Sequence, residues 1–128
     1  MAAALNVVDS SAWLAYLADE PGARHFAAAI EDTRRLVVPS ICVLEVFKIA
    51  LRQRGESDAL QVTALMQQGT VVDLDARLAL DAAKLGLTHK LPLADSVVYA
   101  TARRLQATVW TQDDDFDGLP MVRYFARN

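Results

Sequence analysis

The residues best suited to do chemistry in this chain are acids that border apolar segments. After the apolar residues 107–110 the chain continues as Thr111-Gln112-Asp113-Asp114-Asp115-Phe116-Asp117, which places four carboxylates within five residues. Carboxylates this close repel one another, and none can be buried without a partner. The run is therefore either a solvated acidic turn or one side of a cation-binding site at the end of a strand.

Three further acids stand beside apolar residues elsewhere, and each has an ordinary explanation. Asp9 follows an apolar run and can cap a helix, a task that either of the two following serines could also perform. Glu45 lies in an otherwise apolar stretch, expected to be buried, and can pair with Lys48 three residues on. Asp95 lies among apolar residues in the first turn of an expected helix, where the helix dipole favours it.

The elements that must position these acids follow from the alternation of short apolar segments with helical ones. We expect strands at 5–9, 36–39, 70–74, 107–110 and 122–125, and helices at 12–18, 23–32, 41–54, 58–68, 75–87 and 93–105, with Ser40 and Ser57 as N-caps. This order predicts an α/β fold, a three-layer α/β/α sandwich with a short, mostly parallel central sheet. Ligands of such sheets bind at the carboxyl ends of the strands, so four separate segments are expected to bring acids to one edge.

Length and composition indicate one soluble globular domain over residues 1–128. The chain is 53% hydrophobic and 23% charged, which suffices for a packed core. No apolar run approaches the about 18 residues of a membrane span, and the N-terminal residues do not resemble a signal peptide, so we expect no membrane contact and a cytoplasmic location. Cys42 is the lone cysteine, which excludes an internal disulfide, and its apolar neighbours predict a core position.

The net charge of −3 does not exclude a phosphate-bearing partner. If Asp9, Glu45, Asp95, Asp113 and Asp115 form one metal site, 11 of the 16 acids remain against 13 lysines and arginines. The surface outside such a site would then carry about +2, which is compatible with nucleic acid but does not demand it.

An all-carboxylate site selects a hard cation, Mg²⁺ or Mn²⁺, over zinc. The two histidines, His25 and His89, lie apart from the acids and are expected to be ordinary helix residues. A carboxylate-held cation without a side-chain nucleophile is typical of phosphodiester hydrolysis by a metal-activated water. Ser11 and Thr111 are positioned to hydrogen-bond a ligand carboxylate or a water.

Four motifs, in this order and at this spacing, resemble the PIN domain. They are Val8-Asp9-Ser10-Ser11, Glu45 within a helix that follows a strand, Leu93-Ala94-Asp95-Ser96 with Tyr99-Ala100-Thr101-Ala102, and Thr111-Gln112-Asp113-Asp114-Asp115-Phe116. More narrowly, the chain resembles the VapC toxins of type II toxin–antitoxin systems, over nearly its whole length from about residue 5 to 125.

The resemblance implies a Mg²⁺- or Mn²⁺-dependent endoribonuclease that hydrolyses RNA, forms a homodimer and is held inactive by a VapB-like antitoxin whose C-terminal segment covers the acidic groove. Carried over by position, Asp9, Glu45 and Asp95 would be metal ligands and Asp113 the fourth acid, with Asp115 as an auxiliary ligand. The extra acid Asp114 departs from the family pattern, which leaves open whether Asp113 or Asp115 is the closer ligand.

Other functions stay open at this point. The same fold could serve as a non-catalytic binding or assembly module, or as a DNA-directed nuclease, because nothing in the sequence reads a 2′-hydroxyl. A receiver domain would need two adjacent acids after the first strand, and a haloacid-dehalogenase-type phosphatase would need an acid two residues after Asp9. The chain has serines at both positions, so neither fits.

Overall fold

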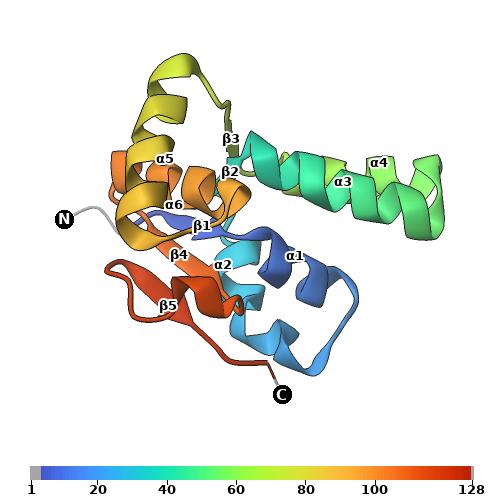
Figure 1. Ribbon diagram of the computed structural model, residues 1–128. Helices are drawn as coiled ribbons and strands as arrows, with labels where there is room; N and C mark the ends of the chain where they lie inside the picture. The colour runs from blue at the N-terminus through green and yellow to red at the C-terminus, as the bar shows by residue number, and fades with distance from the viewer. Residues whose placement is uncertain (1–3, 128) are drawn as a thin grey trace.

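The computed structural model describes residues 4–127, which form a five-stranded parallel sheet flanked by helices (Figure 1). The sheet has the order β3-β2-β1-β4-β5, and each neighbouring pair of strands is parallel. The strands are β1 (Asn6–Val8), β2 (Leu36–Pro39), β3 (Thr70–Val72), β4 (Thr108–Thr111) and β5 (Val122–Tyr124). Met1–Ala3 and Asn128, which the sequence analysis assigned to the same single domain, lie outside the described residues.

Within the described residues, six α-helices and two short 3₁₀ helices connect the strands. The α-helices are α1 (Ser10–Leu17), α2 (Ala27–Glu31), α3 (Ser40–Arg54), α4 (Glu56–Met66), α5 (Ala76–His89) and α6 (Leu93–Leu105), and the 3₁₀ helices are η1 (Pro21–His25) and η2 (Asp114–Phe116). Figure 1 shows α5 and α6 on one side of the sheet and α1 and α2 on the other, with the α3–α4 hairpin extending away from it. The expected α/β/α architecture is confirmed.

The central strands are buried on both faces because helices cover both. Val7 and Val8 of β1, and Val37 and Val38 of β2, are almost completely inaccessible to solvent, as is Val109 of β4. Such uninterrupted apolar strands are typical of parallel sheets. The register pairs Val8 with Trp110, and the Asp9 amide donates to the Trp110 carbonyl at 3.1 Å. The residues just beyond β1 and β4 are therefore neighbours at the carboxyl edge.

One expected helix is wrong: residues 23–32 do not form a single continuous helix. The segment divides into η1 and α2 at Phe26, whose amide donates to the carbonyl of Ala23, three residues back, at 3.0 Å. This tighter turn directs the fully buried Phe26 ring into the core. Packing of one large ring thus overrides the helical tendency of the surrounding alanines.

The two expected serine N-caps are also wrong. The N-cap of α3 is Pro39, and Ser40 is instead the first helical residue, whose hydroxyl accepts a hydrogen bond from the Leu74 amide at 3.3 Å. Helix α4 begins at Glu56, with Gly55 at a φ of 89° as its N-cap, so Ser57 lies inside the helix. A glycine can adopt this left-handed φ without strain, which allows the chain to reverse directly from α3 into α4.

Helix α3 is only partly buried, contrary to expectation. Cys42, Val46 and Ala50 pack into the core, which confirms the core position of Cys42, whereas Leu44 is 56% exposed. None of the helices within residues 4–127 combines the length and the apolar character needed to cross a bilayer.

Candidate metal centre

Three carboxylates from three segments converge at the carboxyl edge of the sheet. Asp9 follows β1, Asp95 lies in the first turn of α6, and Asp113 follows β4. One carboxylate oxygen of each lies within 4.8 Å of those of the other two. The parallel pairing of β1 with β4 brings Asp9 beside Asp113, and α6 starts at this edge because it precedes a parallel strand.

Asp9 is buried and held rigidly. Its Oδ1 accepts hydrogen bonds from the Ser11 hydroxyl at 2.8 Å and from the Ala12 amide at 3.1 Å, so it caps α1 and belongs to the cluster at the same time. Burial is the main reason why the pKa of Asp9 rises from 3.8 to about 6, and the charge of Asp113 adds to the rise. Hydrogen bonds from Ser11, Ala12 and Thr111 act in the opposite direction and lower the pKa.

Asp95 and Asp113 complete the cluster from the more exposed side. Burial, and then the charges of Asp113 and Asp9, raise the pKa of Asp95 from 3.8 to about 8. The Asp113 carboxylate accepts a hydrogen bond from the Asp115 amide at 3.0 Å, and the Asp113 amide donates one to the Thr111 hydroxyl at 2.9 Å. These bonds fix Asp113 at the start of η2.

No lysine or arginine of residues 4–127 forms an ion pair with this cluster. Within residues 4–127 the ion pairs are Arg35–Asp32 and Arg104–Asp75, both elsewhere. The raised pKa values of Asp9 and Asp95 reflect burial first, and then the negative charges of the neighbouring acids. Three convergent oxygen donors with no nitrogen or sulfur ligand among them suit a hard divalent cation.

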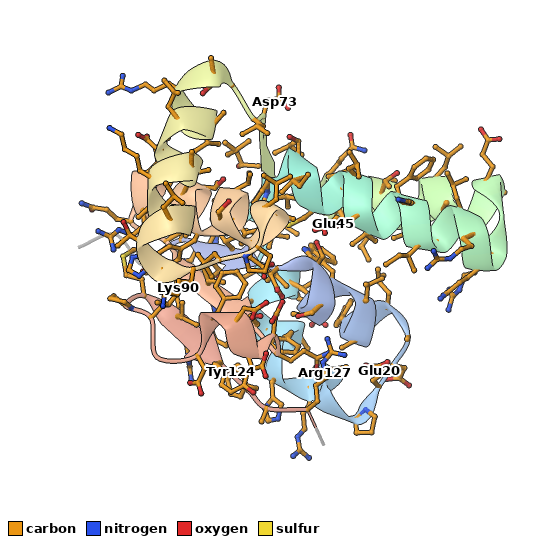
Figure 2. All side chains as sticks on the ribbon, in the orientation of Figure 1. Glu20, Glu45, Asp73, Lys90, Tyr124 and Arg127 are labelled. Atoms are coloured by element: carbon orange, nitrogen blue, oxygen red, sulfur yellow. The ribbon has the colours of Figure 1, made fainter. Side chains whose placement is uncertain are left out.

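Glu45 lies beside the cluster but is not brought into it. Its carboxylate, labelled in Figure 2, accepts a 2.6 Å hydrogen bond from the hydroxyl of Ser10, the residue after Asp9. The three-carboxylate group does not include it. The competing explanation, an ion pair with Lys48, is not found in the described part of the chain either.

The rest of the acidic run is more exposed. Asp113, Asp114 and Asp115 also have oxygens within 4.8 Å of one another, but Asp114 and Asp115 face solvent. Desolvation, with the charges of Asp113 and Asp114, raises the pKa of Asp115. Asp115 thus approaches the site from the solvent side of Asp113.

Sequence reasoning missed two polar side chains that support the site. Ser10 was considered only as a possible helix cap, yet it holds Glu45 next to the cluster. Gln112 is nearly buried, and its amide donates to the Ser11 carbonyl at 3.3 Å, which ties the end of β4 to α1. A polar residue within two positions of the end of an apolar strand was the available signal for both.

Cys42 and the histidines are not part of the cluster. Burial raises the pKa of the Cys42 thiol, and the charges of Asp9, Glu45 and Asp95 add to this effect, so the thiol is neutral at physiological pH. His25 stacks on Phe125 with ring centroids 4.5 Å apart, and His89 meets Tyr99 edge to face.

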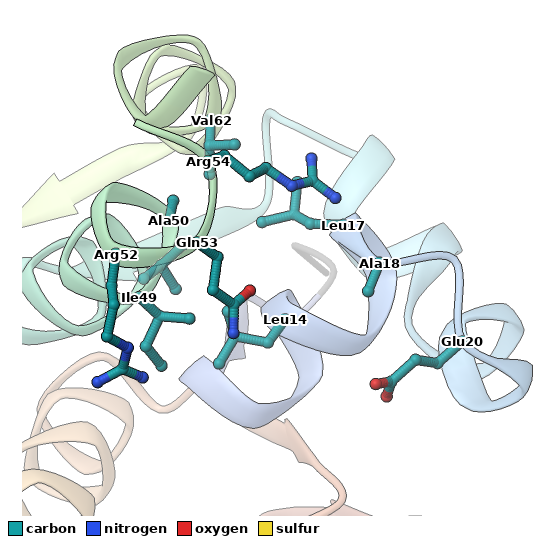
Figure 3. A pocket seen from close by; sticks show the side chains of 11 residues that line it. Leu14, Leu17, Ala18, Glu20, Ile49, Ala50, Arg52, Gln53, Arg54 and Val62 are labelled. Carbon is teal, nitrogen blue, oxygen red and sulfur yellow. The ribbon is translucent and has the colours of Figure 1, made fainter. Parts of the chain in front are cut away.

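Two hollows in the surface differ in character, and only the first is lined by a residue of the cluster. One, of about 310 Å³, adjoins the cluster through Asp113 and extends toward β5 and the residues after it. The other, of about 260 Å³, is mainly apolar and lies between α1 and the α3–α4 hairpin. Figure 3 shows Leu14 and Leu17 of α1 facing α3 across it, with Arg52 and Arg54 at its rim.

Comparisons with known proteins agree with this geometry. The family model of the PIN domain matches residues 7–120. A search of curated proteins finds no significant match.

Several solved structures share the fold at low sequence identity. A toxin–antitoxin complex from Klebsiella pneumoniae aligns with a TM-score of 0.80 and 19% identity, over 95% of this chain and 99% of the other. DNA-bound VapBC from Salmonella typhimurium aligns with a TM-score of 0.72 and 18% identity, over 97% of this chain and 98% of the other. VapC20 from Mycobacterium tuberculosis, a sarcin-ricin loop cleaving toxin, aligns with a TM-score of 0.74 and 19% identity, over 91% of this chain and 96% of the other.

Proposed function

Because this chain belongs to the PIN domain family, we propose that it is a Mg²⁺- or Mn²⁺-dependent endoribonuclease and the toxin of a VapBC-type toxin–antitoxin system. The observation that carries the proposal is the convergence of Asp9, Asp95 and Asp113 at the carboxyl edge of the sheet, where residues 4–127 form no ion pair with them. The likeness in fold to toxin–antitoxin complexes supports the same assignment.

Asp9, Asp95 and Asp113 would hold the cation, with Glu45 and Asp115 as further ligands. A divalent cation bound there would supply Lewis acidity to a phosphodiester and lower the pKa of an attacking water. The protein contributes orientation: the Ser11 hydroxyl and the Ala12 amide hold Asp9, and the Asp115 amide holds Asp113. Ser10 holds Glu45 beside the cluster, where its carboxylate would be a further ligand, and the Thr111 hydroxyl accepts a hydrogen bond from the Asp113 amide.

A protein inhibitor is the second part of the proposal. The apolar hollow between α1 and α3–α4 offers Leu14, Leu17 and Ile49 to an amphipathic segment, and Arg52 and Arg54 to acidic side chains on it (Figure 3). Such a segment would continue toward the acidic groove. The Klebsiella and Salmonella relatives in fold were solved as toxin–antitoxin or VapBC complexes, which supports a VapB-like antitoxin as the partner.

The homodimer belongs to the same proposal. Leu80 and Leu87 of α5 are 68% and 85% exposed, and Leu93 at the start of α6 is 86% exposed. Exposed leucines in neighbouring elements mark a surface that a second copy could cover. Such a toxin would act in the cytoplasm, where its RNA substrates are.

The test compares purified wild-type protein with the variant Asp95→Asn on matched RNA and single-stranded DNA, with Mg²⁺, Mn²⁺ or EDTA. We expect metal-dependent RNA cleavage by wild type, at least about a hundredfold loss in Asp95→Asn, and no loss in the control Asp81→Asn on the exposed face of α5. Cleavage of DNA alone would favour the DNA-directed alternative, and no cleavage of either would favour a binding module. In cells, induced expression should arrest growth unless the antitoxin is co-expressed.

A further inference from the structure

The hollow beside the metal centre has two chemically different walls. Its lining residues are Gln112, Asp113, Asp114, Tyr124, Ala126 and Arg127, and its volume of about 310 Å³ lies at the lower end of the range for small-ligand sites. The acids form one wall and the segment from β5 onward forms the other. Because Asp113 belongs both to this wall and to the acidic cluster, a molecule in the hollow would lie next to the metal centre.

The second wall is fixed in place by an aromatic stack. The Phe125 amide donates to the Thr111 carbonyl at 2.9 Å, which extends the pairing of β5 with β4 by one residue. The Phe125 ring is nearly parallel to the rings of His25 and Trp110, with ring centroids 4.5 Å and 6.1 Å away, respectively. The guanidinium of Arg123 covers the Trp110 ring at 4.4 Å. Residues on either side of Phe125 are therefore held at a defined distance from the acids.

This wall carries a cation and an aromatic ring, the two groups that bind single-stranded nucleic acid. Arg127 is exposed and takes part in neither of the two ion pairs formed by residues 4–127. Tyr124 is partly exposed, and both residues are labelled in Figure 2. Arginine attracts a phosphate, and an aromatic ring offers a surface on which any base can stack. The opposite wall, being acidic, would orient a phosphate toward Arg127.

We propose that this hollow is a nucleotide subsite, which holds the RNA nucleotide next to the cleaved bond through its phosphate at Arg127 and its base or ribose at Tyr124. The inference rests on the proposed ribonuclease function and adds where the substrate strand leaves the metal centre. It makes Arg127 and Tyr124 determinants of RNA affinity that lie outside the metal ligands.

The test measures RNA affinity without cleavage. All proteins carry Asp95→Asn to prevent turnover, and a fluorescent 12-nucleotide RNA of random sequence is titrated at several salt concentrations. We expect Arg127→Gln to reduce the slope of log Kd against log salt by about 0.7, the value for one phosphate contact on a single strand. Tyr124→Ala should raise Kd about fivefold or more, as for loss of one stacked base, whereas Tyr124→Phe should not.

The matched control is Arg34→Gln, which removes the same charge from an exposed arginine. Arg34 precedes β2 and therefore lies at the amino ends of the strands, opposite the metal centre. Thermal unfolding of each variant separates loss of binding from loss of fold. Arg127→Gln and Tyr124→Ala proteins that are folded and bind RNA like the control would overturn the subsite while leaving the ribonuclease assignment intact. The subsite is likewise overturned if the two variants lose antitoxin binding but keep RNA binding. If the Asp95→Asn protein itself binds no RNA, both the subsite and the ribonuclease proposal fail.

Discussion

Replacing Asp9 with asparagine should make the metal-free protein more stable while it abolishes cleavage. Asp9 is buried, and its folded-state pKa of about 6 lies above the ordinary value of 3.8. An asparagine at this position keeps a carbonyl oxygen that can accept from Ser11 and Ala12, as Asp9 does now. Its amide group would face the Asp113 carboxylate as a hydrogen-bond donor, where the native carboxylate repels it.

The magnitude follows from the pKa shift. A rise of about two pKa units at about 1.4 kcal/mol each means that ionising Asp9 costs the fold up to about 3 kcal/mol. Below about pH 4 the folded and unfolded chains are both protonated at Asp9, so the cost is absent. It grows as the pH rises and is complete above about pH 6. We therefore expect Asp9→Asn to gain about 1 to 3 kcal/mol at pH 7.5, or about 3 to 10 °C in Tm.

Thermal unfolding followed by circular dichroism in EDTA, at pH 4 and pH 7.5, measures this directly. Asp81→Asn on α5 is the matched control and should leave Tm unchanged within about 2 °C, the usual range for an exposed substitution. Added Mg²⁺ should stabilise wild type but not Asp9→Asn, because ligand binding to the folded state alone raises stability. The difference between the two proteins should therefore shrink or reverse with metal.

Two unfolding results and one cleavage result would contradict this prediction. If Asp9→Asn unfolds at or below the wild-type Tm in EDTA at pH 7.5, the Asp9 carboxylate is not electrostatically strained in the metal-free fold. If the two proteins differ as much at pH 4 as at pH 7.5, the stabilisation has a cause other than removal of a charge. RNA cleavage by Asp9→Asn at the wild-type rate would remove Asp9 from the catalytic site.

Other expectations follow from the same structure. Asp113→Ala should abolish RNA cleavage, whereas Asp114→Ala should leave at least about half of it, because of these two residues only Asp113 belongs to the three-carboxylate group. The converse result would shift the site by one residue. Isothermal titration with Mn²⁺ should show a binding event in wild type that Asp113→Ala weakens at least about tenfold, and equal binding would contradict a ligand role. Gly69→Ala should lower Tm by about 5 °C or more, because a Cβ there would lie 2.8 Å from the Leu36 carbonyl oxygen and Cγ; an unchanged Tm would mean that β2 yields easily.

Much of the fold could be predicted from short-range sequence patterns. Strand β2 and helix α6 have exactly the expected bounds, because an apolar run closed by Pro39 and a periodic segment following Pro92 specify them locally. Parallel order followed from the alternation of strands with helices. That order in turn placed Asp9 and Asp113 on one edge, since acids directly after parallel strands share that edge.

Tertiary packing decided what local patterns could not. The break at Phe26 accompanies the burial of its ring in the core, and Leu44 of α3 is exposed although its neighbours in sequence are apolar. Neither is encoded within a few residues of the position concerned. Sequence spacing likewise gave no sign that Phe125 would stack with His25 and with Trp110.

The residue types of the candidate ligands follow from the sequence alone, as does the edge of the sheet at which they lie. Which carboxylates meet depends on tertiary packing: Asp9, Asp95 and Asp113 come together, while Ser10 holds Glu45 beside this group. The physical reason is one of scale. Local patterns fix backbone conformation over a few residues, whereas a ligand set requires oxygens from distant segments to agree within a few ångströms, which the packing of whole elements alone can set.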